Sequence, residues 1–392
     1  MHCIIGNNIT AKTLFLLLNS ANIDVILLQK PYNKEENSLY TERFSTRTMA
    51  ITAPNLEILS KIVNITEITE NAGKIKEIHV FNSVKSILPE VVFKAAKFNH
   101  NEFGYIVNYL DLHRYIDIQM EKFAHKIHNP VEILQNGENF TITTDANLNL
   151  SCKDLIITDK TCNYAMKFNP SSKQKFAYNY QESAITLNIS HKIPHNGVAI
   201  EKFTSSGPLA CLPCANSHNS NIVSTIPAQM AWDIKQMSQE KQKIFIQSAI
   251  LKPLQQYFGN LEIISEIAIF PLHLKINTQP DMKNIAFCGA ENFTMHPIAG
   301  QGFNLALRDL QRMCNILQES GNINLFKEGN LGRKLDISSM LFITHNLNQM
   351  FKIKNRPFTT LRKNGMKIVN NCRFLTSHLT NNAIGTGIFN KI

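Results

Sequence analysis

A glycine-rich loop in the last third of the chain combines residue types that could bind a flat ligand. It reads CGAENFTMHPIAGQGFNL from Cys288 to Leu305. Gly300 and Gly302 would let a planar group approach the backbone closely, because glycine has no side chain. A helix that begins at about Phe303 would direct its unpaired amide groups, and the positive end of its dipole, at that group. The loop therefore predicts a site for a planar ligand that carries partial negative charge.

The N-terminal segment has the pattern that positions a nucleotide. Residues 1–5 form a short apolar run, residues 10–22 have helical spacing, and residues 24–28 form a second run rich in β-branched and aliphatic residues. Strand, tight turn, helix and strand in this order begin a parallel βαβ unit. In such units a ligand binds at the first strand-to-helix turn.

That turn carries an altered dinucleotide fingerprint. The standard form G-x-G-x-x-G becomes Gly6, Asn8 and Ala11 here. Asn8 tolerates the backbone conformation of the second glycine, but its side chain occupies space that a pyrophosphate would need. Gln29 stands where the second strand would end in an acidic residue that holds a ribose hydroxyl, and an amide binds a hydroxyl more weakly than a carboxylate.

The remaining segments predict an α/β fold with three parts. Residues 183–225 alternate apolar and polar side chains with period two, which is typical of an antiparallel sheet. The apolar run 285–288 resembles a further strand of the first sheet. We therefore expect a discontinuous Rossmann-like domain (1–110, 151–178 and 280–320), an inserted antiparallel β-sheet domain (179–279) and a helical C-terminal region (321–392).

Composition limits the classes of partner. The 392 residues are 44% hydrophobic and 18% charged, which is ordinary for a globular protein, and the formal net charge is +10. The lysines are scattered, and no stretch alternates aromatic and basic residues, so we expect no nucleic-acid partner. Contact with an anionic membrane surface stays open. The eight cysteines include one C-x-x-C, Cys211 and Cys214, but no second pair completes a zinc site, so we expect no metal and no disulfide framework.

The ordered motifs resemble the FAD-dependent hydroxylases of ubiquinone biosynthesis, within the para-hydroxybenzoate-hydroxylase-like class. Their late motif has the form G-D-A-A-H-x-x-H-P-x-A-G-Q-G-x-N-L-G-x-R-D. The chain matches it at Gly289, His296, Pro297, Ala299, Gly300, Gln301, Gly302, Asn304, Leu305, Arg308 and Asp309. Further matches in the family's order are Arg47-Thr48, Gly104 to Val107, Tyr180 with Ser183-Ala184, Phe203 with Gly207 to Ala210 and Leu212-Pro213, Arg333, Asp336, Leu347, Phe351, Leu361-Arg362 and Gly365.

The departures from the family pattern gather at the expected cofactor site. Besides the altered fingerprint, the family's Asp-Gly is Asp159-Lys160, and its Gly-Asp, whose carboxylate binds the ribityl chain, is Gly289-Ala290. Alanine accepts no side-chain hydrogen bond, and whether Glu291 replaces the lost carboxylate stays open. The motif histidine is Phe293, and a family glutamine is Glu182. Lys12 or Lys160 could offset part of the lost phosphate binding.

The resemblance implies a set of site residues. Gly300, Gln301, Gly302 and Asn304 would support the isoalloxazine, and His296 and Pro297 would line its active face as the catalytic pair. Gly6 and Asn8 would face the pyrophosphate, and Arg47 would approach the cofactor or the nicotinamide. Ala11, Gln29, Asp159, Gly289 and Ala290 complete the expected cofactor-binding set.

The resemblance also implies the chemistry. NAD(P)H would reduce FAD, O2 would add at flavin C4a as a hydroperoxide, and the ring of a polyprenylated phenol would take the oxygen in the sheet domain. Residues 340–351 could line a prenyl pocket, although plain helix core explains their pattern better. The alternative is an FAD-deficient relative that serves as a scaffold or regulatory subunit of a quinone-biosynthesis complex. We expect a cytoplasmic location, with contact at the periphery of the inner membrane left open.

Overall fold

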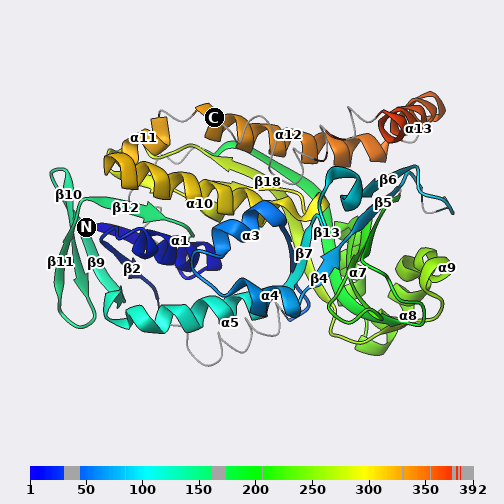
Figure 1. Ribbon diagram of the computed structural model, residues 1–392, viewed down its shortest axis with the longest axis horizontal. Helices are drawn as coiled ribbons and strands as arrows, with labels where there is room; N and C mark the ends of the chain where they lie inside the picture. The colour runs from blue at the N-terminus through cyan, green and yellow to red at the C-terminus, as the bar shows by residue number, and fades with distance from the viewer. Residues whose placement is uncertain are drawn as a thin grey trace.

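The computed structural model describes residues 1–30, 45–83, 85–159, 174–204, 206–328, 331–353 and 355–372, with residues 377 and 380. Figure 1 shows a parallel sheet with its helices at one end and a large antiparallel sheet at the other. The long C-terminal helix α12 runs along both parts.

Five parallel strands form the first sheet, in the order β19-β12-β1-β2-β8. The central strand β1 begins at the N-terminus and pairs with β2 and β12. Strands β2 and β19 are entirely apolar, and β1 and β12 are apolar after their first residue, as expected for a sheet that is covered on both faces. Their bounds are β1 His2–Ile5, β2 Val25–Leu28, β8 Ile127–His128, β12 Asp154–Ile157 and β19 Ile285–Phe287.

Helices cover one face of this sheet and a small antiparallel sheet covers the other. The helical face contributes Leu14 of α1, Leu112 of α5 and Leu310 of α10 to the main core. On the other face, Ile133 and Phe140 pack against strands β1 and β12. The elements are α1 (Ile9–Ser20), α5 (Tyr109–Met120), α10 (Gln301–Ser320), β9 (Pro130–Asn136), β10 (Asn139–Thr144) and β11 (Asn149–Cys152), with the 3-10 turn η2 (Glu121–Lys126) after α5.

A three-stranded antiparallel sheet, β3-β7-β4, lies between the two large sheets. It carries helices α3 and α4, which connect β3 to β4 along the chain. The bounds are β3 Thr48–Thr52, α3 Ala53–Leu59, α4 Ile65–Glu70, β4 Gly73–Ile75 and β7 Gly104–Asn108, with the 3-10 turn η1 (Ala95–Phe98) before β7.

The large sheet has the order β20-β18-β13-β16-β15-β14-β5-β6, and β17 pairs with β13. Helices α7, α8 and α9 cover one of its faces over a core that includes Ile185, Leu187 and Ile222. The elements are β5 (Glu77–Phe81), β6 (Val91–Lys94), β13 (Gln174–His191), β14 (Val198–Thr204), β15 (Gly207–Pro213), β16 (Asn219–Pro227), α7 (Ala228–Lys235), α8 (Gln239–Ile246), η3 (Gln247–Leu251), η4 (Lys252–Leu254), α9 (Gln255–Phe258), β17 (Leu261–Ile263), β18 (Ala268–Asn277) and β20 (Phe293–Thr294).

The C-terminal helices are α11 (Ile323–Glu328), α12 (Leu331–Lys352) and α13 (Arg356–Asn371). Two buried ion pairs join α12 to α10. Arg308 donates to Asp336 at 3.0 Å through both Nε and Nη2, and Arg333 Nε donates to Asp309 at 2.6 Å. Because each pair makes two hydrogen bonds, the crossing of the two helices is fixed in register.

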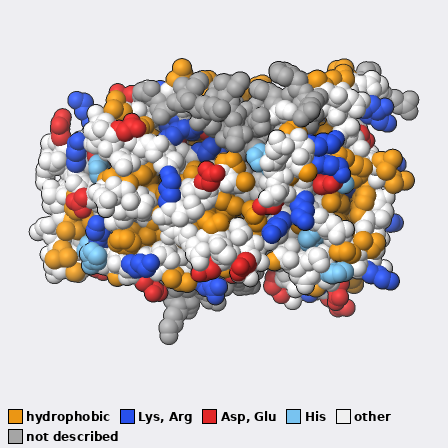
Figure 2. Space-filling model, viewed as in Figure 1, with side chains coloured by type: hydrophobic (Ala, Val, Ile, Leu, Met, Phe, Trp, Pro, Cys, Tyr) orange, Lys and Arg blue, Asp and Glu red, His pale blue; other side chains and the backbone are white. Residues whose placement is uncertain are grey.

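The predicted fold class is confirmed, and the structure adds two strands to the expected second sheet. Strands β5 and β6 lie within residues 1–110, yet β5 pairs in parallel with β14. Basic and acidic side chains are interspersed on the face seen in Figure 2. In the described part of the chain, no helix has both the length and the apolar character needed to cross a bilayer.

Candidate active site

The first turn of the parallel sheet is held by a residue far away in the sequence. Gly6 has a φ of +154°, and a Cβ at this position would lie 2.0 Å from Thr158 Oγ1, so only glycine fits. The carboxylate of Asp159 accepts hydrogen bonds from the backbone amides of Asn7 at 2.8 Å and Asn8 at 3.0 Å. The structure thus places Asp159 beside the fingerprint.

Asn8 caps the helix that follows the turn. Its Oδ1 accepts from Ala11 N at 2.9 Å, and its Nδ2 donates to the carbonyl oxygen of Thr158 at 3.1 Å. This is an ordinary N-cap, which satisfies one of the free amides at the helix start. The side chain therefore occupies the end of α1, where the family's second glycine would leave room for a phosphate. A pyrophosphate in that position requires the Asn8 side chain to rotate away.

Other residues expected near the adenosine half have partners within the protein. Gln29 follows β2 and donates from Nε2 to the Gly6 carbonyl at 3.5 Å, which places it beside the turn as predicted from its sequence position. Lys12 Nζ lies 2.5 Å from the Asp117 carboxylate. Because this carboxylate already neutralises much of the Lys12 charge, Lys12 would attract a phosphate only weakly. Arg47 is exposed, and its guanidinium lies 4.8 Å from the centre of the Tyr109 ring. Lys160 lies outside the described residues.

The Gly289 region packs directly on α1. Gly289 has a φ of +62°, and a Cβ there would lie 2.6 Å from Thr10 Cγ2. The backbone of Ala290 lies in the 3-10 turn η5 (Gly289–Glu291), whereas its side chain is outside the described set. Glu291 is buried, and its Oε1 accepts from Asn277 Nδ2 at 3.2 Å. That bond directs the Glu291 carboxylate toward β18, so it makes a poor substitute for a carboxylate at position 290.

The start of α10 has the geometry expected for a ring-binding helix end. Gly300 ends the 3-10 turn η6 (Ile298–Gly300) and adopts the left-handed conformation, with a φ of +61°. A Cβ at this position would lie 2.9 Å from Ala50 Cβ, so the loop and β3 approach as closely as glycine allows. No side chain caps this helix, and its first turn contains no acidic residue. No described side chain therefore neutralises the positive end of this helix of 20 residues.

Gly302 and Gln301 play smaller steric roles in this loop. A Cβ at Gly302 would meet Met295 Cγ at an ordinary contact distance of 3.8 Å, so the backbone alone does not require glycine there. The Gln301 side chain is buried within the first turn of α10.

Asn304 acts as a clamp between three elements. It is fully buried, and its Oδ1 accepts from Thr52 N at 3.0 Å and from Asn55 Nδ2 at 2.8 Å. Its Nδ2 donates to the carbonyl oxygens of Ala50 at 2.7 Å and Gly300 at 3.2 Å. The side chain is used entirely within the protein. Asn304 therefore positions the loop against β3 rather than offering a hydrogen bond to a ring.

His296 lies behind the loop, where the ring is completely buried. Its Nε2 is 3.8 Å from Glu182 Oε2, and its ring packs edge-to-face on Tyr180 at 5.0 Å between centroids. Burial lowers the pKa of His296, and the Glu182 carboxylate offsets part of that shift. The ring is enclosed behind the loop in this structure, and its place at an active face stays a prediction. Pro297, which begins η6, keeps partial exposure.

Glu182 is the centre of a buried polar cluster between β13 and α12. It accepts hydrogen bonds from Asn348 Nδ2 and Lys352 Nζ, each at 3.0 Å. Burial raises the pKa of Glu182, but the nearby His296 ring and the hydrogen bonds from Asn348 and Lys352 outweigh burial and leave the pKa below its ordinary value. The sequence marked Glu182 only as a departure from a family glutamine. Its partners on α12 could not be found from sequence spacing.

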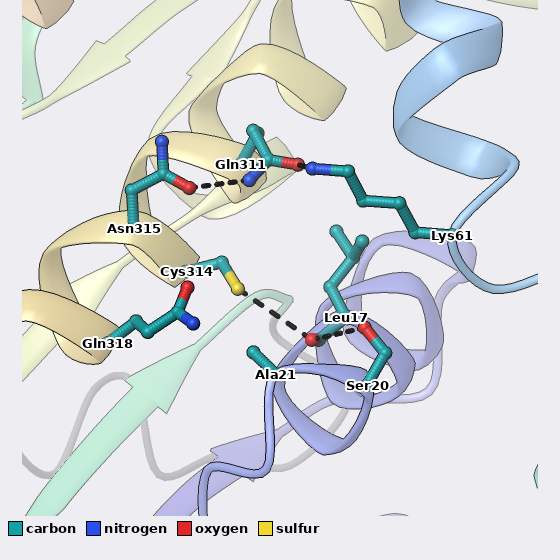
Figure 3. A pocket seen from close by; sticks show the side chains of 8 residues that line it. All are labelled: Leu17, Ser20, Ala21, Lys61, Gln311, Cys314, Asn315 and Gln318. Atoms are coloured by element: carbon teal, nitrogen blue, oxygen red, sulfur yellow. Dashed lines mark hydrogen bonds between the residues drawn. The ribbon is translucent and has the colours of Figure 1, made fainter.

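A surface pocket of about 310 Å³ lies at the other end of α1, away from these residues. Figure 3 shows Cys314 and Gln311 of α10 facing Leu17 and Ser20 of α1 across it. Three of the eight lining residues have amide side chains, and Cys314 Sγ donates to the Leu17 carbonyl at 3.7 Å. This pocket is separate from the predicted cofactor site. Among the described residues, no group of histidine, cysteine and acidic side chains has the arrangement of a metal site.

The isoalloxazine end of the predicted FAD site thus suits the cofactor better than the pyrophosphate end does. At the isoalloxazine end, the uncapped start of α10 and the close approach of Gly300 to β3 suit a flat, partly anionic ring. At the pyrophosphate end, Asn8 fills the helix start with its own side chain. FAD therefore fits the loop as it stands and fits the fingerprint only after Asn8 rotates.

Comparison with known proteins supports the motif-based resemblance. No protein-family model matches the chain. The ubiquinone hydroxylase UbiL of Rhodospirillum rubrum is 25% identical over 218 residues, covering 53% of this chain and 49% of UbiL. The mitochondrial ubiquinone biosynthesis monooxygenase COQ6 of Rattus norvegicus is 23% identical over 397 residues, covering 88% of this chain and 82% of COQ6. The chain spans about half the length of the first curated relatives it matches.

Solved structures share the fold of this chain. The p-nitrophenol 4-monooxygenase PnpA of Pseudomonas putida has a TM-score of 0.72 at 11% identity, with 98% of each chain covered. Klebsiella pneumoniae HpxO, in complex with FAD and uric acid, has a TM-score of 0.69 at 12% identity, covering 99% of this chain and 97% of HpxO.

The fold is therefore that of the FAD-containing aromatic monooxygenases. Within this class the chain is similar to the hydroxylases of ubiquinone biosynthesis, and the predicted resemblance is confirmed.

Proposed function

We propose that the protein is an FAD-dependent monooxygenase that hydroxylates the ring of a polyprenylated phenol, with NAD(P)H as reductant and O2 as oxidant. The observation that carries this proposal is the start of α10. There a left-handed Gly300, in close contact with Ala50, precedes a helix whose first turn has no side-chain cap. Such an end binds the negative charge that reduced flavin carries.

The residues of this chain would position the reactants. The amides at the start of α10 would hold the ring, and Asn304 would fix the distance between this loop and β3 through its four hydrogen bonds. The buried His296 and Glu182 would support the loop from behind. When bound, FAD would supply the activation of oxygen, and the protein would supply orientation and exclusion of water. The oxygen chemistry that the resemblance implies is part of this proposal.

A second candidate function rests on the fingerprint. Because Asn8 caps α1 from within, the pyrophosphate end is closed by the protein's own side chain. This favours an FAD-deficient relative that serves as a scaffold or regulatory subunit in a quinone-biosynthesis complex. We favour the enzyme, because closure of the fingerprint depends on one rotatable side chain whereas the ring-binding loop depends on backbone geometry.

The cellular setting is part of the same proposal. A polyprenylated substrate would be extracted from a membrane, so we propose a cytoplasmic protein that contacts the inner membrane peripherally. The exposed apolar residues Phe342, Leu361 and Ile368 on α12 and α13 suit such contact. Met340 and Leu341 pack in the core, so these two residues of the expected prenyl pocket are structural.

One assay separates the two functions. The purified protein is incubated with FAD, NADPH or NADH and a short-chain prenylphenol, and the products are analysed by mass spectrometry. The enzyme requires NAD(P)H consumption that depends on the phenol, together with a product heavier by one oxygen atom. No consumption and no oxygenated product at saturating FAD would leave only the scaffold function.

A further inference from the structure

Strand alternation places Glu201 on the face of the large sheet that the helices α7 to α9 leave uncovered. Along β14, Ile200 belongs to the core beneath those helices, so Glu201 points to the opposite face with Ala199 and Phe203. Its neighbour Lys202 points to the helix side, where its ammonium lies 4.2 Å from the centre of the Phe81 ring and donates to Tyr257 Oη.

The residues directly across from Glu201 are small or aliphatic. Glu201 pairs with Val80 on β5 and Ala210 on β15, Ala210 pairs with Val223 on β16, and Val223 pairs with Thr186 on β13. Directly paired residues share a face of the sheet. Thr186 is occupied, because its hydroxyl hydrogen-bonds Thr46 Oγ1 at 3.0 Å. In this row of paired residues Glu201 is the acidic side chain, and its neighbours Val80, Ala210 and Val223 are small or aliphatic.

This face is the one that meets the ring-binding loop. Val223 packs against the cluster that contains Met295 and Leu305, which flank the loop in sequence. Ala50, which touches Gly300, packs with Leu212 against a second cluster that contains Ala199. The row from Glu201 to Thr186 therefore runs between two clusters that both contact the loop or β3. A substrate that reaches this row would therefore be near the residues that contact the ring-binding loop.

Glu201 has no hydrogen bond or ion pair with any described residue. It is half-buried, and burial raises the pKa of Glu201 to about 7. The nearby cations have partners of their own: Lys352 of α12 binds Glu182, and Arg362 of α13 binds Asn82 and the Met350 carbonyl. The strands on either side, β5 and β15, place Val80 and Ala210 opposite Glu201. A half-buried carboxyl group without a protein partner is available to accept a hydrogen bond from a polar ligand group.

We propose that Glu201 is the substrate-binding residue that hydrogen-bonds the ring hydroxyl of the phenol, while the ring lies across Ala210 and Val223. The proposal rests on the proposed function and assigns it a substrate class: phenols with a free hydroxyl group, in preference to their ethers. The carboxylate would accept the phenol proton in a charge-assisted hydrogen bond, which raises the electron density of the ring. Ala210 and Val223 would present short apolar side chains to the ring.

The test compares 2-allylphenol with its methyl ether, 2-allylanisole, in the wild type, Glu201→Ala and Glu201→Gln. Binding is measured by calorimetry on the full-length protein with FAD in the buffer, and circular dichroism checks folding. We expect the wild type to bind the phenol about tenfold more tightly than the ether and Glu201→Ala to lose that preference, because an unpaired hydroxyl in a buried site weakens binding. Glu262→Gln, an exposed glutamate of β17 in the same sheet, is the matched control and should keep the preference.

The pH dependence gives an independent readout. Wild-type affinity for 2-allylphenol should rise as the pH increases through about 7, where Glu201 ionises, and Glu201→Gln should show no such rise. Equal preference for the phenol in wild type and Glu201→Ala would overturn the assignment, even if FAD binds and NAD(P)H is consumed. If FAD fails to bind while the preference depends on Glu201, the proposed monooxygenase is wrong and the phenol site stands.

Discussion

The carboxylate of Asp159 accepts a hydrogen bond from the backbone amide of Asn8 at 3.0 Å, and the Asn8 side chain donates to the preceding residue, Thr158. The first turn and the end of β12 are therefore joined by two hydrogen bonds, one to a side chain and one to the backbone. This lock fixes the conformation of the first turn. It also keeps the Asn8 side chain on the helix start, where a pyrophosphate would bind.

Asn8→Gly should open the pyrophosphate site. The substitution removes the side chain that caps Ala11 N, and glycine at an N-cap costs only about a few tenths of a kcal/mol of stability. We expect FAD to bind about tenfold more tightly, because the helix start is then free to receive phosphate. Quenching of flavin fluorescence measures the affinity. Asn64→Gly, at the N-cap of the exposed helix α4, serves as the control, and unchanged FAD affinity in Asn8→Gly would show that Asn8 does not limit binding.

Ala290→Asp should restore a hydrogen-bond acceptor near the ribityl chain. The backbone of residue 290 lies in η5, held against α1 by the contact of Gly289 with Thr10. A carboxylate that gains a ribityl hydroxyl as partner would tighten FAD binding by about 1–3 kcal/mol. The same fluorescence titration detects the change. Weaker or identical binding would argue that position 290 does not face the ribityl chain.

Asn304→Ala should destabilise the protein far more than an exposed asparagine of the same helix. The substitution leaves the Thr52 amide and the carbonyls of Ala50 and Gly300 without their buried partner, at a cost of about 2–4 kcal/mol in the free energy of unfolding. Asn315→Ala, on the exposed face of α10, should change it by no more than about 0.5 kcal/mol. Urea unfolding monitored by circular dichroism compares the two. Similar losses in both variants would refute the clamp.

Acid should destabilise the protein partly through His296. Burial lowers the pKa of His296 below its ordinary 6.5, so the unfolded chain takes up a proton at a higher pH than the folded protein does. The contribution of the neutral His296 ring to the free energy of unfolding is therefore fully present above pH 6.5 and decreases as the pH falls below 6.5. Melting temperatures should decline less steeply below pH 6.5 in His296→Asn than in wild type. His125→Asn, in the exposed part of η2, should leave the decline unchanged, and an unchanged decline in His296→Asn as well would contradict the prediction.

Features encoded by short sequence patterns could be predicted from the sequence, whereas contacts between distant segments could not. The spacing of Gly6, Asn8 and Ala11 located the first turn, and the glycines near 300 located the start of α10. Period-two alternation also predicted the antiparallel sheet. The direction of the Asn8 side chain depends on Thr158 and Asp159, about 150 residues away, and no local pattern contains that information.

The buried histidine and the unpaired glutamate illustrate the same limit. His296 was expected at an open face because of its motif, but β13 and α12 enclose it with Tyr180 and Glu182. Glu201 stands two residues before Phe203, where a matched string begins, and alternation alone would have placed both on one face. Its role depends on having no partner, which only the assembled sheet shows. Strands β5 and β6 joined the second sheet through a parallel pairing with β14 that local periodicity does not specify.

The measurement that tests the central claim most directly is a titration of the purified protein with FAD, followed by its visible absorption and by quenching of flavin fluorescence. If the start of α10 holds an isoalloxazine ring, binding should saturate at micromolar FAD and give a yellow protein after removal of free cofactor. Gly300→Val, which would clash with Ala50, should abolish that uptake in a folded protein. A colourless wild-type protein that shows no saturable quenching would contradict the account.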